Sequence, residues 1–323
     1  MRSSHCAAAA MIGLLTLPAV ALAQSWPSQP IKIVVPYAAG GVLDVLARLA
    51  AEHIRAKTGQ PTVVENRAGA AGNTALAQLA KTEADGYTIG ALPVSNYQVN
   101  PHIYKSMPLD MTKDLIAVAP MAEAPQLLVA PASLQLNSLS ELIAYAKVNP
   151  AKFNYGSAGV GTPNHVSTAF VLQSLGITAS HVPYRGAAPA VTDLLTGSLQ
   201  MMVVAPLTLG GQIEAGQLKA LSAVSDKRVP GYADVPTIAE QGFRPYDLAI
   251  WYGIVAPAGT KSEIVDKLNR LIVSMPEEPS IARKFRELSL QPMPVTATEF
   301  ATQIAADAPK WAKVIKDAGI TAE

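Results

Sequence analysis

The chain has 323 residues, with 25 basic and 24 acidic side chains and a formal net charge of +1. This balance, without a Lys/Arg cluster, argues against a nucleic-acid surface or a polybasic membrane patch. Apolar residues make up 50% of the chain and charged residues 15%, which is typical of a well-packed globular protein.

The first residues have the pattern of a secretory signal peptide. Arg2 precedes an apolar or small-residue stretch at 7–21, and Ala21-Leu22-Ala23 is an A-x-A cleavage site. We therefore expect residues 1–23 to be removed and the protein to be exported to the periplasm. Cys6 is the only cysteine and lies in the removed segment, so we expect no disulfide, no thiolate nucleophile and no cysteine metal site.

The mature chain alternates strand-like and helix-like segments, which predicts an α/β fold with mostly parallel sheets. Apolar helical spacing predicts helices at 42–56, 263–275 and 298–318, and Gly59 is the expected C-cap of the first. Ser138 and Glu141 form a capping-box pattern before a further helix that Asn149-Pro150 ends. The expected strands are residues 31–35, 62–65, 88–92, 127–130, 153–155, 180–182, 199–204 and 218–223.

About 300 mature residues exceed the usual size of one core, so we expect two lobes. Pro120 and Pro125 bracket a crossing near 122–126, and a return crossing fits residues 246–251. These crossings predict lobe 1 at 24–124 and 250–323 and an inserted lobe 2 at 125–249. Two crossings would allow the hinged closure of a Venus-flytrap protein.

Three glycine-containing turns, each between a strand and a helix, are the candidate anion loops. The unpaired N–H groups at a helix start hold an anion without a catalytic side chain. The first loop contains Tyr37, Gly40, Gly41, Val42, Leu43 and Asp44. An ordinary turn in which Asp44 is an N-terminal cap is the alternative.

The second and third loops have the same pattern. In the second loop, Gly159 and Gly161 allow close backbone approach, and Thr162 is a candidate cap before Pro163. Asn164 stands where a dinucleotide site needs glycine, which disfavours a nicotinamide cofactor. Arg185 in the third loop is a candidate carboxylate partner, or else a surface Arg in a turn. The candidate residues are Ser157, Gly159, Val160, Gly161, Thr162, Pro163, Asn164 and His165 in the second loop, and Tyr184, Arg185, Gly186, Ala187 and Ala188 in the third.

Catalytic motifs are absent from the sequence. It has no G-x-S-x-G, S-x-x-K, H-E-x-x-H or P-loop pattern, and its histidines are dispersed. His165 is either a ligand donor or a neighbour of the helix start. We expect no catalytic residue, no metal site and no cofactor.

The residues also resemble a known family, the Bug family of extracytoplasmic receptors of tripartite tricarboxylate transporters. The resemblance spans the mature chain and rests on ordered segments, among them Val35-Pro36-Tyr37-Ala38-Ala39-Gly40-Gly41 with Asp44, Val64-Glu65-Asn66-Arg67, Asp85-Gly86-Tyr87-Thr88, Tyr155-Gly156-Ser157-Ala158-Gly159, Val182-Pro183-Tyr184-Arg185-Gly186 and Trp251-Tyr252-Gly253.

The resemblance implies a two-lobed periplasmic binding protein that holds a small-molecule carboxylate through backbone amides and bound waters. It implies delivery to membrane transporter subunits, and it places Trp251 at the border of the cleft. We expect a monomer. Docking on a sensor kinase and, less favoured, an exported enzyme acting on a small acid are the alternatives.

The chain departs from the family pattern in the first loop, where Val42 and Leu43 replace the usual small and hydroxyl residues. It departs again in the second loop, where Val160 and Pro163 stand at places that are usually polar or small. Apolar groups at Val42, Leu43, Val160, Pro163, Ala187 and Ala188 predict a ligand with a hydrophobic body. The hypothesis is an aromatic or apolar carboxylate, or a dicarboxylate with its second group near Arg185, in preference to citrate.

Overall fold

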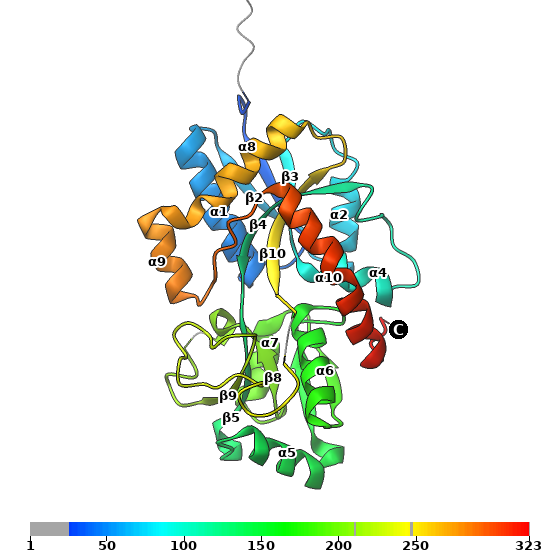
Figure 1. Cartoon of the computed structure of the whole chain (residues 1–323), viewed down its shortest axis with the longest axis vertical. Coiled ribbons are helices and arrows are strands. Elements are labelled where there is room, and N and C mark those ends of the chain that lie inside the picture. The colour runs from blue at the N-terminus through cyan, green and yellow to red at the C-terminus, as the bar shows by residue number, and fades with distance from the viewer. Residues whose placement is uncertain (1–25, 210, 246–247, 323) are drawn as a thin grey trace, which may run out of the picture.

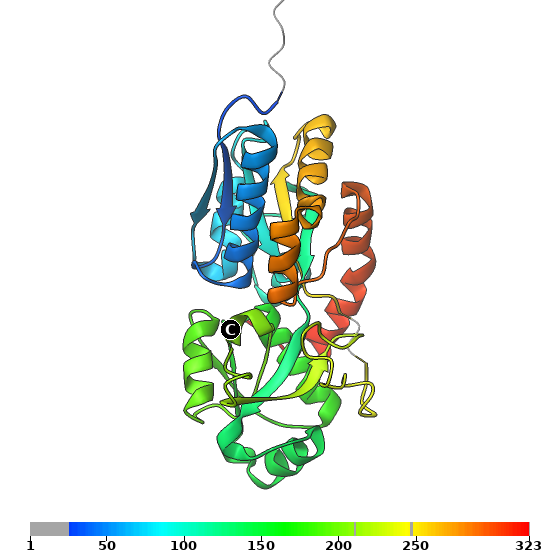
Figure 2. The same cartoon turned by 90° about the vertical axis from the view of Figure 1, so that its left-hand side faces the viewer.

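The computed structural model describes residues 26–209, 211–245 and 248–322. Two lobes lie end to end, joined at a narrow waist (Figures 1 and 2). The expected signal peptide, and Tyr246 and Asp247 of the expected return crossing, lie outside the described residues. In the described part of the chain, no helix combines the length and the apolarity that a membrane span requires.

The first sheet lies in the upper lobe of Figure 1 and has the strand order β2-β1-β3-β10-β4. β1 pairs in parallel with β2 and β3, whereas β10 is antiparallel to β3 and β4. Four of its five strands therefore point the same way. The strands are β1 (Ile31–Val35), β2 (Thr62–Asn66), β3 (Thr88–Pro93), β4 (Leu115–Glu123) and β10 (Trp251–Pro257).

Helices cover both faces of this sheet, with α1 and α8 on one side and α2 and α10 on the other (Figure 1). Helix α1 forms because its apolar residues recur at helical spacing, and Gly59 ends it in the left-handed conformation at φ 71°. The expected C-cap is thus confirmed. The helices of this lobe are α1 (Val42–Thr58), α2 (Asn73–Leu79), α3 (Val94–Gln98), α4 (Asn100–Ile103), α8 (Ser262–Val273), α9 (Pro279–Glu287) and α10 (Ala297–Asp317).

The second lobe contains a three-stranded sheet, β8-β5-β9, and a parallel pair, β6-β7. A parallel bridge between Tyr155 and Met201 connects the two. The Ser138 hydroxyl accepts the Glu141 N–H at 3.2 Å, which confirms the expected cap of α5. The elements are β5 (Gln126–Pro131), α5 (Leu139–Val148), β6 (Asn154–Ser157), α6 (Pro163–Leu175), β7 (Ser180–Pro183), α7 (Ala187–Leu195), β8 (Met202–Val204) and β9 (Leu218–Val224).

Strand β4 was not among the strands expected from the sequence, and Pro120, which was expected to border the crossing, lies within it. The structure accommodates this proline because β4 is an edge strand that pairs only with β10. Pro120 lies opposite Gly253, beside a register shift of the ladder. Proline is tolerated at such edge and bulge positions, where no ladder N–H is needed.

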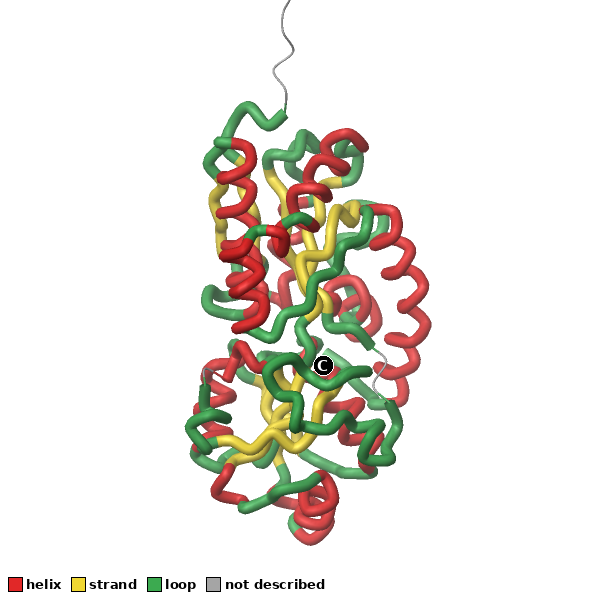
Figure 3. Tube along the Cα trace, turned by 60° about the vertical axis from the view of Figure 1, so that its left-hand side comes forward, coloured by secondary structure: helices red, strands yellow, loops and turns green. Residues whose placement is uncertain are grey.

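Strand directions bring the three candidate loops to the junction of the lobes. β4 leads through Ala124-Pro125 into β5, so the carboxyl ends of β1 to β4 face lobe 2. β5 starts at the junction and runs antiparallel to β8 and β9, so β8 and β9 end towards lobe 1. β6 and β7 end there too, because β6 is parallel to β7 and to the chain at Met201. Ligands of open α/β sheets bind beyond the carboxyl ends of strands. Helix α10 also reaches the junction, where Gln173 of α6 donates to the Asp317 carbonyl at 3.1 Å (Figure 3).

Candidate functional site

The first loop begins α1 with backbone donors and no side-chain cap. Gly40 has φ 89°, and Gly41 is the N-cap. Among the described residues, no hydrogen bond uses the N–H of Val42 or Leu43. A Cβ on Gly40 or Gly41 would meet no atom within 4 Å. These donors therefore border open space, as an anion site requires.

The Asp44 carboxylate stabilises this loop through hydrogen bonds that occupy both of its oxygens, so it is not free to contact a ligand. Its Oδ2 accepts the Gly40 N–H and the Arg48 Nε–H, each at 3.0 Å, and its Oδ1 accepts from Asn66 Nδ2 at 3.0 Å. The residue is 4% exposed. Burial alone would raise the pKa of Asp44, but the hydrogen bonds from Arg48, Gly40 and Asn66 outweigh it and hold the pKa below its usual value.

Tyr37 belongs to a polar cluster around the carbonyl oxygen of Ala71. That oxygen lies 3.0 Å from the Tyr37 hydroxyl, 2.9 Å from Asn96 Nδ2 and 3.2 Å from Asn100 Nδ2. Burial raises the pKa of Tyr37 well above its usual value, so the hydroxyl stays protonated. Ala71 has φ 48°, a left-handed conformation that costs free energy for a non-glycine residue and that these three side chains hold.

The second loop is held by its own side chains. The Ser157 hydroxyl lies 3.1 Å from both the N–H nitrogen and the carbonyl oxygen of Gly159. Thr162 occupies the N-cap position of α6, but its hydroxyl donates to the Gly159 carbonyl at 2.7 Å, so the expected side-chain cap is wrong. Pro163 begins the helix as expected.

Two stacked histidines support the second loop. The rings of His165 and His181 lie 3.9 Å apart and nearly parallel, and Tyr155 stacks on His181 at 4.8 Å. His165 Nδ1 accepts the Gly161 N–H at 3.2 Å, and His181 Nε2 lies 2.7 Å from Ser157 Oγ. His165 is therefore a positioning residue in this structure, and His181, not a candidate from the sequence, joins it.

Both imidazoles are neutral at neutral pH. Burial, and then the proximity of His181, lowers the pKa of His165 to about 3. Burial lowers the pKa of His181 to about 4. Neutral rings are what the loop requires, because His165 Nδ1 must accept the Gly161 N–H and a charged imidazole has no acceptor.

The side chain of Asn164 is also committed to the fold, since its Nδ2 donates to the Val203 carbonyl at 3.1 Å. The backbone N–H groups of Asn164 and His165 remain, because the first N–H groups of a helix have no acceptor within it. No hydrogen bond between described residues uses them. The second loop thus offers two main-chain donors, as the first loop does.

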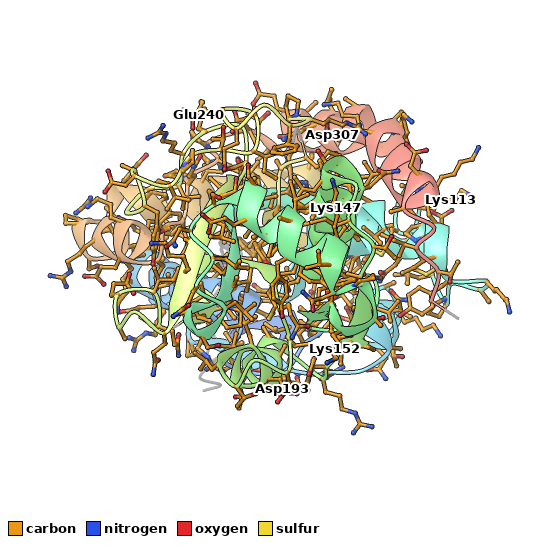
Figure 4. The ribbon with its side chains drawn as sticks, turned by 90° about the horizontal axis from the view of Figure 1, so that it is seen from below. Lys113, Lys147, Lys152, Asp193, Glu240 and Asp307 are labelled. Carbon is orange, nitrogen blue, oxygen red and sulfur yellow. The ribbon has the colours of Figure 1, made fainter. Side chains whose placement is uncertain are left out.

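The third loop lies beside the second. The Tyr184 N–H donates to the Ser157 carbonyl at 3.0 Å, and the Gly186 N–H to the Ala158 carbonyl at 3.2 Å. The Tyr184 hydroxyl donates a hydrogen bond to Asp193 of α7, which is labelled in Figure 4. Burial, and to a smaller extent this hydrogen bond, raises the pKa of Tyr184 to about 12. Arg185 is exposed, with no ion pair or hydrogen bond from its side chain to any described residue.

Ala187 and Ala188 begin α7 and complete the third loop. Their N–H groups have no acceptor among the described residues. A Cβ on the preceding Gly186, at φ 122°, would meet no atom within 4 Å. The second and third loops therefore form one surface of lobe 2 with several unpaired donors.

The lobes touch where the second loop meets α4. A Cβ on Gly161 would lie 2.5 Å from Ile103 Cδ1 and 3.3 Å from Asn100 Oδ1. Two cavities in the described part of the chain lie away from the three loops. One of about 560 Å³ lies between the ends of α1 and α8, and one of about 240 Å³ lies at the crossings.

Trp251 is not at the border of the site in this structure. It is 1% exposed, with its ring 6.3 Å from Tyr97 and edge-on to Phe300 at 4.8 Å. The side chains of Val42 and Leu43 are likewise buried in the core. Of the six apolar residues expected to contact the ligand, Val160, Ala187 and Ala188 keep some exposure, whereas Pro163 is also buried.

Comparisons with known proteins identify the family and the fold of this chain. Residues 46–320 match the protein family described as "Tripartite tricarboxylate transporter family receptor". Protein BugT of Bordetella pertussis is 32% identical, over 92% of this chain and 91% of its own.

Two solved structures are similar over their whole length. R. palustris Rpa4515 with adipate has 34% identity and a TM-score of 0.87, covering 92% of this chain and 99% of its own. The periplasmic binding protein BugD has 31% identity and a TM-score of 0.84, with the same coverage. The two-lobed periplasmic binding fold and the expected resemblance are thus confirmed: this chain belongs to the receptor family of tripartite tricarboxylate transporters.

Proposed function

We propose that this protein is a periplasmic receptor that captures a small carboxylate between its lobes and delivers it to the membrane subunits of a tripartite tricarboxylate transporter. The observation that supports this proposal is the presence of unpaired N–H groups on both lobes. They begin α1 in lobe 1 and α6 and α7 in lobe 2, at the ends of strands that face each other. Such donors hold a carboxylate without transforming it.

The ligand class we propose is an aromatic or apolar carboxylate, including dicarboxylates. Arg185 is the exposed cation of the three loops, and Val160, Ala187 and Ala188 provide apolar surface. A citrate would bring three carboxylates to loops with a single cation, and desolvating unpaired charges is costly. The adipate bound by the R. palustris relative is consistent with a dicarboxylate that has an apolar body.

A receptor role, without catalysis, also suits the Ser157–His181 pair. The hydroxyl and imidazole lie within hydrogen-bond distance, but Ser157 is 0% exposed and its hydroxyl already contacts Gly159. A nucleophile must reach its substrate. We assign this pair to positioning the loop and assign the protein no cofactor.

The remaining features of the proposal concern processing and closure. We propose cleavage after Ala23, a monomeric mature protein, and closure of lobe 1 (24–124 and 250–323) on lobe 2 (125–249) about the two crossings. Ligand contacts from both lobes would favour the closed state.

Calorimetric titration of Gly41→Val with a panel of carboxylates tests the site. Gly41 has φ −83° and ψ 172°, which valine adopts, and its Cβ direction is open. We expect a loss of stability of about 1 kcal/mol, because valine is a poorer N-cap than glycine. We also expect at least a tenfold loss of affinity, because the side chain obstructs the approach to the α1 N–H groups. The panel contains benzoate, adipate and citrate, and mass spectrometry of the co-purified ligand extends it.

Lys261→Val is the matched control, because Lys261 is the exposed N-cap of α8 and also has no side-chain cap. Equal affinity of Gly41→Val and the wild type would contradict the assignment of the loop. Tight citrate binding without binding of benzoate or adipate would contradict the ligand class. Uptake into vesicles that contain the transporter subunits, with and without the receptor, tests delivery.

A further inference from the structure

Asn100 places a buried, unpartnered acceptor at the junction of the lobes. The residue is 0% exposed, and its Oδ1 has no hydrogen-bond partner among the described residues. Buried polar atoms are nearly always paired, so an unpaired oxygen in contact with the candidate site requires an explanation.

The orientation of the Asn100 amide is fixed by its neighbours. Its Nδ2 donates to the Ala71 carbonyl at 3.2 Å and to Asn73 Oδ1 at 2.7 Å. The reverse orientation would place Oδ1 against the Ala71 carbonyl oxygen, where neither atom has a proton to donate. The unpaired atom is therefore the oxygen, and it can only accept a hydrogen bond.

This oxygen is directed at the second loop. The Cβ position of Gly161 lies 3.3 Å from Asn100 Oδ1, and the Gly161 N–H is already donated to His165 Nδ1. Lobe 2 thus covers the acceptor without supplying a donor. Movement of lobe 2 away from α4 would expose Oδ1 to water, so closure without a ligand leaves it unpaired.

The surroundings of Asn100 are polar but uncharged. Ser95, on α3, is 1% exposed, and its buried hydroxyl interacts with the hydroxyl of Tyr37. Tyr37 and Asn96 converge on the same Ala71 carbonyl as Asn100. A second carboxylate here would meet an acceptor oxygen and no cation, whereas an uncharged donor would be well accommodated.

We propose that the ligand carries, besides its carboxylate, an uncharged hydrogen-bond donor, a hydroxyl or a primary amide, that donates to Asn100 Oδ1 as the lobes close. This inference rests on the proposed function and narrows its ligand class. It makes Asn100 a specificity-determining residue, since a ligand without the donor leaves the acceptor buried and unpaired.

Calorimetric titration with matched acids tests the inference. The probes are benzoate against 3- and 4-hydroxybenzoate, and hexanoate against 6-hydroxyhexanoate and adipic acid monoamide. In each series we expect the best donor-bearing acid to bind the wild type at least tenfold more tightly than its parent. Equal binding of parent and donor-bearing acids overturns the inference and leaves the proposed function standing. Binding of none of these acids overturns both.

Asn100→Ala separates recognition from a structural role. Recognition predicts that the ratio of the two affinities falls towards one in this variant, whereas a purely structural role weakens both acids equally and leaves the ratio unchanged. An unchanged ratio overturns the inference. Circular dichroism checks folding. If Asn100→Ala is unfolded, the wild-type ratios decide the question alone.

Discussion

Replacing His181 by phenylalanine should weaken the pH dependence of stability. The unfolded chain protonates a histidine with a pKa of about 6.5, whereas His181 in the native protein has a pKa of about 4. Between these values the unfolded state binds more protons than the native state, so stability falls as pH decreases from about 6.5 to about 4.

The magnitude follows from these two pKa values. Lowering the pH from about 7 to about 5 should cost the native state at most about 2 kcal/mol through His181. Since His181 keeps some solvent contact, about 1–2 kcal/mol is the expected range. His181→Phe abolishes this contribution and keeps a ring to stack between Tyr155 and His165.

His181→Phe also removes the hydrogen bond between His181 and Ser157. This loss lowers the free energy of unfolding by about 1 kcal/mol at every pH. The two effects are therefore separable, one as a constant offset and the other as a slope. Urea unfolding of the mature protein at several pH values from 5 to 7 measures both.

Tyr155→Phe is the matched control, because it alters the same stack and removes a phenol whose pKa burial raises to about 12. Its stability should keep the wild-type dependence between pH 5 and 7. A His181→Phe variant with the wild-type slope would refute the conclusion that His181 is held neutral in the fold.

Two further substitutions test the packing and the first loop. Gly253→Ala should destabilise the protein by about 1–3 kcal/mol, since its methyl would lie 2.8 Å from Phe300 Cζ and 3.0 Å from the Ala119 carbonyl oxygen. Urea unfolding measures this, with Gly41→Ala as the unhindered control, and equal stability of the two variants would contradict it. Asp44→Ala should cost about 1–3 kcal/mol, because the Gly40 N–H and the Asn66 amide lose their acceptor. It should also weaken carboxylate binding, and an Asp44→Ala protein with unchanged stability and affinity would show that Asp44 does not hold the loop.

Local patterns were sufficient for much of the fold. The spacing of apolar residues predicted α1, and the chemistry of Gly59 and Ser138 predicted a helix end and a helix start. These signals act within a few residues, so they survive in any tertiary context. The order of strands and glycine turns also predicted a helix after each of the three turns, where α1, α6 and α7 begin.

Tertiary contacts overrode local patterns elsewhere. Pro120 was expected to border the crossing between the lobes, yet it lies within β4, an edge strand with a register shift beside that proline. Trp251 was expected at the border of the site, but Tyr97 and Phe300 enclose it. Tyr184 and Asp44 had the chemistry of ligand contacts, but Asp193 in one case and Arg48 and Asn66 in the other already bind them.

The amino-acid sequence by itself determined the α/β receptor fold, the helix caps at Gly59 and Ser138 and the three glycine turns that precede helices, because these features depend on short-range spacing and on the chemistry of single residues. Only the tertiary structure decided which polar atoms remain available. The stack of His181 on His165, and the unpaired oxygen of Asn100 facing Gly161, join residues from different elements or lobes. Whether a buried polar atom is satisfied depends on all its neighbours in space, which local sequence does not specify.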